Sequence, residues 1–200
     1  ILFPLLLTLL SSRLKYWRTA LFVLLLVSFG MSTWAVAHAP ERAFFLLQMR
    51  AWELLAGAML AVMPVREYRA SPALAQAVSL AGLGLILLAV FAYDPSTPFP
   101  GAAALLPVAG VVCLIWANGQ QTTLTSKLLG SRLLVGIGLI SYSWYLWHWP
   151  VYVFGKYASV DGLGPWELGA LFVLSLVLGY ASWRFVEAPF RERRLLAGRK

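Results

Sequence analysis

The chain has 200 residues, of which 60% are hydrophobic and 12% are charged, and its mean hydropathy is +0.77. Soluble domains are about 45 to 50% apolar, so this composition excludes an ordinary soluble domain and indicates an integral membrane protein. The net charge of +8 does not indicate a nucleic-acid partner, because the basic residues fall between apolar segments. Cys113 is the only cysteine, which excludes disulfide frameworks and cysteine metal clusters, and we predict no metal site.

Apolar stretches of roughly 17 to 25 residues recur along the chain, and each is long enough to cross a hydrocarbon core of about 30 Å as a helix. Residues 1–10 cover only about 15 Å and have no initiator Met or basic n-region, so we interpret them as the end of a truncated span and not as a signal peptide. The sequence predicts an all-α, polytopic transmembrane helical bundle. We expect one truncated N-terminal span and about six complete spans, at about 19–37, 44–63, 77–93, 102–117, 133–154 and 167–186.

The basic residues predict the topology of this bundle. They concentrate in alternate loops, and only Arg42 and Lys156 lie in the opposite set of loops. Loops rich in Lys and Arg stay in the cytoplasm, so we expect the Lys200 end to be cytoplasmic. The same rule places the loops at 94–101 and 155–166 outside.

The third predicted span contains two charged residues, Arg50 and Glu53. With a helix start near residue 44, they lie about 9 Å and about 14 Å along the axis, close to the middle of the membrane. Each costs roughly 2.5 to 3.5 kcal/mol there, and the i, i+3 spacing lets the two side chains meet. Gly57 and Ala61 continue the Glu53 face as a ridge of small residues, which predicts close approach of a neighbouring helix. Two interpretations stay open for the pair, a structural ion pair and a polar functional cavity.

A second polar group occupies the fifth complete span, in the stretch "SYSWYLWHWP" at 141–150. Helical spacing aligns five polar or aromatic side chains on one broad face: Ser141, Trp144, Tyr145, His148 and Tyr152. Pro150 leaves the Leu146 carbonyl without its helical donor, which predicts a bend near His148. The tryptophans are also typical of an aromatic belt at the membrane surface, and His148 can be a site residue or a packed, hydrogen-bonded one.

The last predicted span ends in "SWRFVEAPFRERR" at 182–194. We expect Arg184 and Glu187 to pair at i, i+3, Pro189 to stop the helix, and the basic cluster to anchor the end inside. No dinucleotide fingerprint, phosphate-binding loop or nucleophile elbow is present.

Together, these motifs resemble the membrane acyltransferase family called acyltransferase family 3, which contains bacterial O-acetyltransferases of lipopolysaccharide and peptidoglycan. The resemblance covers nearly the whole chain, and the segment ending in "YLWHWP" is its most specific part. The matching pieces are "LFPLLL" (2–7), "RAWELLAGAMLA" (50–61), "FPGAAALLPVAG" (99–110), "LLGSRLLVGIGLISYSWYLWHWPVYVF" (128–154) and "FVEAPFR" (185–191).

This resemblance implies a membrane O-acyltransferase, most simply an O-acetyltransferase, of the bacterial inner membrane. Acetyl-CoA or another acyl-CoA would be the donor, with no bound cofactor, and the acceptor would be a hydroxyl of an envelope polysaccharide or glycolipid. Membrane lipid would surround the protein. The competing hypotheses are a transporter or flippase of envelope precursors and a catalytically silent scaffold.

The resemblance further implies that residues 1–200 are the C-terminal portion of one membrane-embedded domain. The family motif that carries the catalytic base lies upstream of Ile1, so the fragment alone is expected to be inactive. Supporting catalytic roles are expected for Glu53, His148 and Arg50. Four residues of the aromatic segment are expected to bind substrate: Ser141, Tyr145, Trp149 and Tyr152.

Overall fold

The computed structural model describes residues 16–62, 70–94, 96–159 and 162–191, and within these ranges every regular element is a helix. The all-α prediction is therefore confirmed. The chain divides into two compact units, residues 1–127 and 128–200, and each is described by itself.

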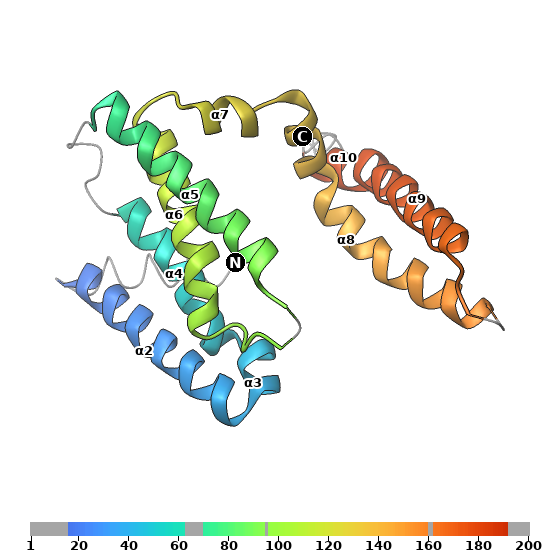
Figure 1. The fold of residues 1–200 in the computed structure, drawn as a ribbon, viewed down its shortest axis with the longest axis horizontal. Coiled ribbons are helices and arrows are strands. Elements are labelled where there is room, and N and C mark those ends of the chain that lie inside the picture. The colour runs from blue at the N-terminus through green and yellow to red at the C-terminus, as the bar shows by residue number, and fades with distance from the viewer. Residues whose placement is uncertain (1–15, 63–69, 95, 160–161, 192–200) are drawn as a thin grey trace, which may run out of the picture. The chain divides into compact units, whose positions relative to one another are not determined.

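The first unit consists of two pairs of packed helices (Figure 1). In one pair α2 packs against α4, and in the other α5 packs against α6. Its elements are α2 (Trp17–His38), α3 (Pro40–Phe45), α4 (Leu47–Val62), α5 (Pro72–Ala92), the 3-10 turn η2 (Ala102–Ala104) and α6 (Leu105–Gln120). A short helix, α7 (Leu124–Leu129), contains the boundary between the units.

A buried serine joins α2 to α4. The Ser28 hydroxyl donates to the Gln48 carbonyl oxygen at 2.6 Å and accepts the backbone N–H of Trp52 at 3.0 Å. The Trp52 ring packs edge-on against Phe29, with ring centroids 5.0 Å apart. Because the apolar membrane interior offers no water to these groups, the hydroxyl fixes how α4 lies against α2.

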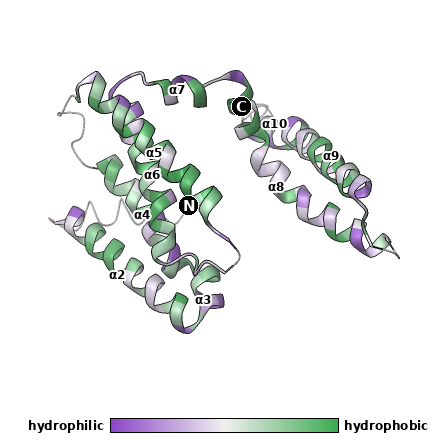
Figure 2. Cartoon of the chain, viewed as in Figure 1, coloured by the Kyte–Doolittle hydropathy of each residue, from purple (hydrophilic) through white to green (hydrophobic). Residues whose placement is uncertain are grey.

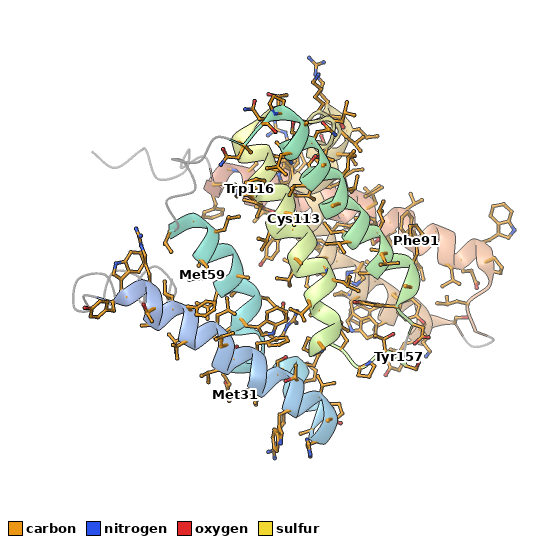
Figure 3. The ribbon with its side chains drawn as sticks, turned by 60° about the vertical axis from the view of Figure 1, so that its left-hand side comes forward. Met31, Met59, Phe91, Cys113, Trp116 and Tyr157 are labelled. Atoms are coloured by element: carbon orange, nitrogen blue, oxygen red, sulfur yellow. The ribbon has the colours of Figure 1, made fainter. Side chains whose placement is uncertain are left out.

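Two glycines let α5 and α6 approach closely. A Cβ placed on Gly82 would lie 2.7 Å from the Gly110 carbonyl oxygen and 2.9 Å from the Cβ of Cys113. Figure 3 shows Cys113 and Trp116 on α6. Small residues at such a crossing allow backbone contact in a membrane, and Cys113, which is partly buried, belongs to this packing.

The loop between α5 and α6 is held by its own hydrogen bonds. The Asp94 carboxylate accepts the backbone N–H of Ser96 at 2.8 Å and the Ser96 hydroxyl at 2.6 Å. The Tyr93 hydroxyl donates across the loop to the Ala103 carbonyl oxygen at 2.5 Å. Gly101 has φ of +30°, which a residue with a side chain rarely adopts.

The second unit is a helical hairpin whose second helix is followed directly by a π-helix and a short α-helix. Gly155 of α8 contacts Leu171 of α9, and Trp144, further back in α8, contacts Gly179, so the helices run antiparallel. The elements are α8 (Arg132–Ala158), α9 (Pro165–Ser182), the π-helix η3 (Trp183–Glu187) and α10 (Ala188–Arg191).

Four helical segments are long and apolar enough to cross a membrane: Trp17–His38, Pro72–Ala92, Ala102–Gln120 and Pro165–Arg191. Figure 2 shows hydrophobic residues covering most of their length. The other two predicted spans correspond to α4, which has 16 residues, and α8, which has 27 and includes many aromatic and polar residues. The count of six complete spans stays a prediction, and the truncated span lies outside the described residues.

The structure corrects two predicted helix boundaries. The third span does not start near residue 44, because Leu46 is extended (φ −83°, ψ 124°) and α4 begins at Leu47. Arg50 and Glu53 therefore lie only about 4.5 Å and about 9 Å from the start of their helix. Pro189 does not stop the last helix, because the helical segment that begins at Pro165 passes through the π-helix and Pro189 and continues to Arg191. Pro150 also lies inside a helix, because α8 continues through it from Arg132 to Ala158.

Candidate functional site

The predicted pair of Arg50 and Glu53 forms on α4. Arg50 Nε donates to Glu53 Oε1 at 3.3 Å, and Arg50 Nη2 donates to Glu53 Oε2 at 3.2 Å. The guanidinium carbon also lies 5.5 Å from the centre of the Phe44 ring, at cation–π distance. Two parallel contacts and an aromatic face hold the guanidinium in one orientation.

Both side chains stay accessible, with 38% of Arg50 and 21% of Glu53 exposed within the described structure. The contacts to Glu53 use Nε and Nη2 of Arg50, so Nη1 has donors for a further acceptor. The pair is thus more than a closed internal salt bridge, because an anionic or carbonyl oxygen can reach the guanidinium.

Glu53 lines a pocket of about 240 Å³. Every other lining residue is apolar: Gly57 from α4, Phe99 from the loop, Ala104 from η2, and Pro107, Val108, Val111, Val112 and Ile115 from α6. A single polar group at an apolar wall, here the Glu53 carboxylate paired with Arg50, suits a ligand that has an aliphatic part and a polar end.

Gly57 lacks, among the described residues, the close contact with a neighbouring helix that its spacing from Glu53 predicts. A Cβ placed on Gly57 would have no atom within 4 Å among the described residues, and Ala61 is exposed. Among the residues that the structure describes, no helix packs closely on the predicted ridge, because α4 turns Trp52 and Leu55 into its buried face. In this structure Gly57 leaves room in the pocket.

The α8 face forms a second pocket, in the second unit, of about 300 Å³. Its α8 residues are Ser141, Trp144, Tyr145 and His148, and α9 contributes Phe172 and Ser175. The predicted face is confirmed for these four residues of α8. Trp149 and Tyr152 do not line the pocket, although their rings lie together with centroids 5.9 Å apart.

One hydrogen bond orients the His148 ring. Its Nδ1 lies 2.6 Å from the Tyr145 carbonyl oxygen. A carbonyl oxygen only accepts, so Nδ1 carries the proton, and in the neutral ring Nε2 is left as an acceptor. The pocket lining contains no formally charged Asp, Glu, Lys or Arg. This combination suits an uncharged ligand with hydroxyl groups.

The sequence did not predict two sets of contacts in this unit. Trp144 Nε1 donates to the Ser175 hydroxyl at 3.0 Å, which joins α8 to α9. Glu187 does not pair with Arg184 as expected: its Oε2 accepts the Ser143 hydroxyl at 2.8 Å, and its Oε1 lies 3.6 Å from Arg191 Nη1. The i, i+3 rule applies to α-helices, whereas Arg184 and Glu187 lie in a π-helix with a different rotation per residue.

Comparison with known proteins identifies the family of the chain. The model of a family described as "Acyltransferase domain" matches residues 1–184. The chain belongs to this acyltransferase family. The resemblance to acyltransferase family 3 is thereby confirmed, and the transporter alternative is not favoured.

Named relatives agree with this family assignment. O-acetyltransferase OatA of Staphylococcus aureus (strain NCTC 8325 / PS 47) is 28% identical over 208 residues, covering 96% of this chain and 34% of the relative. A putative O-acetyltransferase, SACOL0978 of Staphylococcus aureus (strain COL), is 28% identical over 183 residues, covering 86% of this chain and 30% of the relative. The chain thus spans about a third of the length of these curated relatives. No solved structure matches it.

Proposed function

We propose that the full-length protein is an O-acetyltransferase of the bacterial inner membrane, with its Lys200 end in the cytoplasm. Acetyl-CoA is the proposed donor and a hydroxyl of an envelope polysaccharide or glycolipid the proposed acceptor. The observation that carries this proposal is the family match over residues 1–184, together with relatives named as O-acetyltransferases.

In the proposed reaction the acceptor hydroxyl loses its proton to a base, and its oxygen attacks the thioester carbonyl carbon. The carbon–sulfur bond then breaks, and the thiol of coenzyme A leaves with a proton. Negative charge develops on the carbonyl oxygen, so fixed donors beside that oxygen accelerate the step. The residues of this chain are proposed to support the step, and the base itself is left unassigned.

Arg50 is the proposed donor, because its guanidinium is oriented by Glu53 and Phe44, its Nη1 takes no part in the two contacts to Glu53, and 38% of its side chain is exposed. It can face either the carbonyl oxygen or a phosphate of the donor, both of which present oxygen acceptors. Glu53 holds the guanidinium with both carboxylate oxygens, so its proposed role is to orient Arg50. The neighbouring apolar pocket of about 240 Å³ is of a size for an aliphatic part of the donor.

The pocket on α8 is the proposed place for the acceptor sugar. His148 Nε2 can accept a hydrogen bond from a sugar hydroxyl, since Nδ1 already donates to Tyr145. Ser141 and Tyr145 add hydroxyl groups at the same pocket. Trp149 and Tyr152, whose rings lie together on α8, can cover the apolar face of a further sugar unit.

Transfer of labelled acetyl from acetyl-CoA to envelope glycan tests this proposal, using membranes that carry the full-length protein and membranes that lack it. Label in the glycan only when the protein is present supports an O-acetyltransferase. If the glycan stays free of acetyl label while a separately labelled, unmodified precursor moves into the lumen of vesicles, the result would instead favour the transporter hypothesis.

A further inference from the structure

Glu187 is the acceptor of a hydrogen bond that crosses between helices. Ser143 is 2% exposed, and its hydroxyl lies 2.8 Å from Glu187 Oε2. A hydrogen bond from a buried hydroxyl to a carboxylate is charge-assisted and stronger than one between neutral groups. The only other partner that the described residues offer this carboxylate is Arg191, which lies further away and is largely exposed.

The π-helix explains why Glu187 faces α8 at all. An α-helix rotates by about 100° per residue, so a straight continuation of α9 would turn position 187 about 120° away from Ser175. A single π-turn amounts to one inserted residue, and it brings Glu187 back to about 20° from Ser175. Glu187 thereby joins the stripe of Ser175 and Gly179, both of which contact Trp144.

These contacts hold α8 on two flanks. On one flank Ser143 donates to Glu187, and on the other Trp144 Nε1 donates to Ser175 at 3.0 Å. Between them, a Cβ on Gly179 would lie only 2.7 Å from the Cα of Trp144, so the helices are in backbone contact. With bonds on both sides of this contact, α8 cannot turn about its own axis without breaking one of them.

We propose that Glu187 is a positioning residue, which through Ser143 fixes the rotation of α8 and so the direction of its Tyr145 and His148 face. This inference rests on the proposed function, in which that face binds the acceptor. A side-chain atom lies about 6 Å from the helix axis, so a rotation of about 20° moves it by about 2 Å. A displacement of that size is enough to lose a productive hydrogen bond.

The kinetic test compares Glu187→Ala and Ser143→Ala with Glu187→Gln and Arg191→Gln in membranes carrying the full-length protein. Glutamine keeps a carbonyl oxygen for Ser143, and Arg191→Gln removes only the ion pair, so both are matched controls. Each alanine variant is expected to raise the KM for the acceptor about tenfold and to leave the KM for acetyl-CoA unchanged. The double variant is expected to be no worse than either single one, and the controls to stay near wild type.

A second measurement does not depend on activity. Cys113 is the only cysteine of these 200 residues. In a full-length background in which Cys113 and any cysteine outside this segment are replaced by alanine, Tyr145→Cys can be labelled alone with a small maleimide. The labelling rate is expected to change at least about threefold when Glu187→Ala is added and to stay constant with Arg191→Gln.

The two measurements separate the failure of this inference from the failure of the proposed function. Absent transfer by the wild type would contradict the proposed function, while the labelling rates would still decide whether Glu187 positions α8. An unchanged acceptor KM in active, stably inserted alanine variants, or an unchanged labelling rate, would overturn the positioning role. A lower yield of folded protein with unchanged KM values would indicate packing only and would overturn it as well.

Discussion

Arg50 and Glu53 face each other through two parallel contacts, Nε to Oε1 at 3.3 Å and Nη2 to Oε2 at 3.2 Å. This arrangement needs the planar fork of a guanidinium, because an ammonium group cannot make both contacts in one plane. The orientation of Arg50, and not only its charge, is therefore the property on which its proposed role depends.

Arg50→Lys is expected to lower acetyl transfer about ten- to a hundredfold at equal protein level. Lysine keeps the charge but loses the bidentate contact and the stacking on Phe44. The measurement is initial rate of label transfer in membranes. Arg42→Lys, at an exposed residue of α3, is the matched control and is expected to behave as wild type. Equal rates for both variants would show that orientation at Arg50 is irrelevant.

Gly57→Leu is expected to fill the pocket beside Glu53 and to reduce transfer at least about tenfold without unfolding the protein. The structure has open space at this glycine, so the new side chain meets no described atom within 4 Å at its Cβ. Gly30→Leu on α2, which also has open space, serves as control. Transfer rates and thermal stability are measured together. Full activity of a stable Gly57→Leu protein would remove this pocket from the proposed mechanism.

Gly82→Ala is expected to destabilise the contact between α5 and α6 by about 1 to 3 kcal/mol, because the new methyl group overlaps the Gly110 carbonyl oxygen. Gly84→Ala on the same helix meets nothing within 4 Å and is expected to be neutral or slightly stabilising. Unfolding in detergent measures the difference. If both variants unfold alike, the close approach of the two glycines is incorrect.

The turn at Asp94 is expected to lose order in acid. Hydrogen bonds from the Ser96 side chain and backbone lower the pKa of this carboxyl group below its ordinary value, and bonds from Thr97 act in the same direction. A carboxylate with a lowered pKa stabilises the folded turn above its unfolded pKa, and this stabilisation is lost as the pH falls through the folded pKa. NMR titration of a protein labelled at Asp94 measures the value. Ser96→Ala is expected to raise it towards the ordinary value, and an unchanged titration would contradict the hydrogen-bonding account.

Several parts of the structure follow directly from the sequence. Apolar length identifies the helices, and the i, i+3 spacing of Arg50 and Glu53 correctly predicts their ion pair. The helical spacing of the α8 face also places Ser141, Tyr145 and His148 at one pocket. These successes share a cause, since each depends on the regular rotation of an uninterrupted α-helix.

The errors arise where that regular rotation is interrupted. The break at Leu46 has no glycine or proline to mark it, so the apolar pattern runs through it and places Arg50 too far along its helix. The π-helix likewise leaves no trace in residue spacing, and it turns Glu187 from Arg184 towards Ser143. Which face of α4 packs on α2 depends on Ser28, a residue 20 positions from Gln48, and local periodicity contains no such information.

In the proposed function, the full-length protein transfers acetyl groups and Glu53 supports the transfer. Label transfer from acetyl-CoA to envelope glycan tests both parts when wild type is compared with Glu53→Gln at matched protein level, with exposed Glu41→Gln as control. We expect transfer by wild type and by Glu41→Gln, and a drop of at least about tenfold for Glu53→Gln, because the amide no longer holds the guanidinium by charge. Full transfer by a stable Glu53→Gln protein would contradict the role of Glu53, and no transfer by wild type would contradict the proposed reaction.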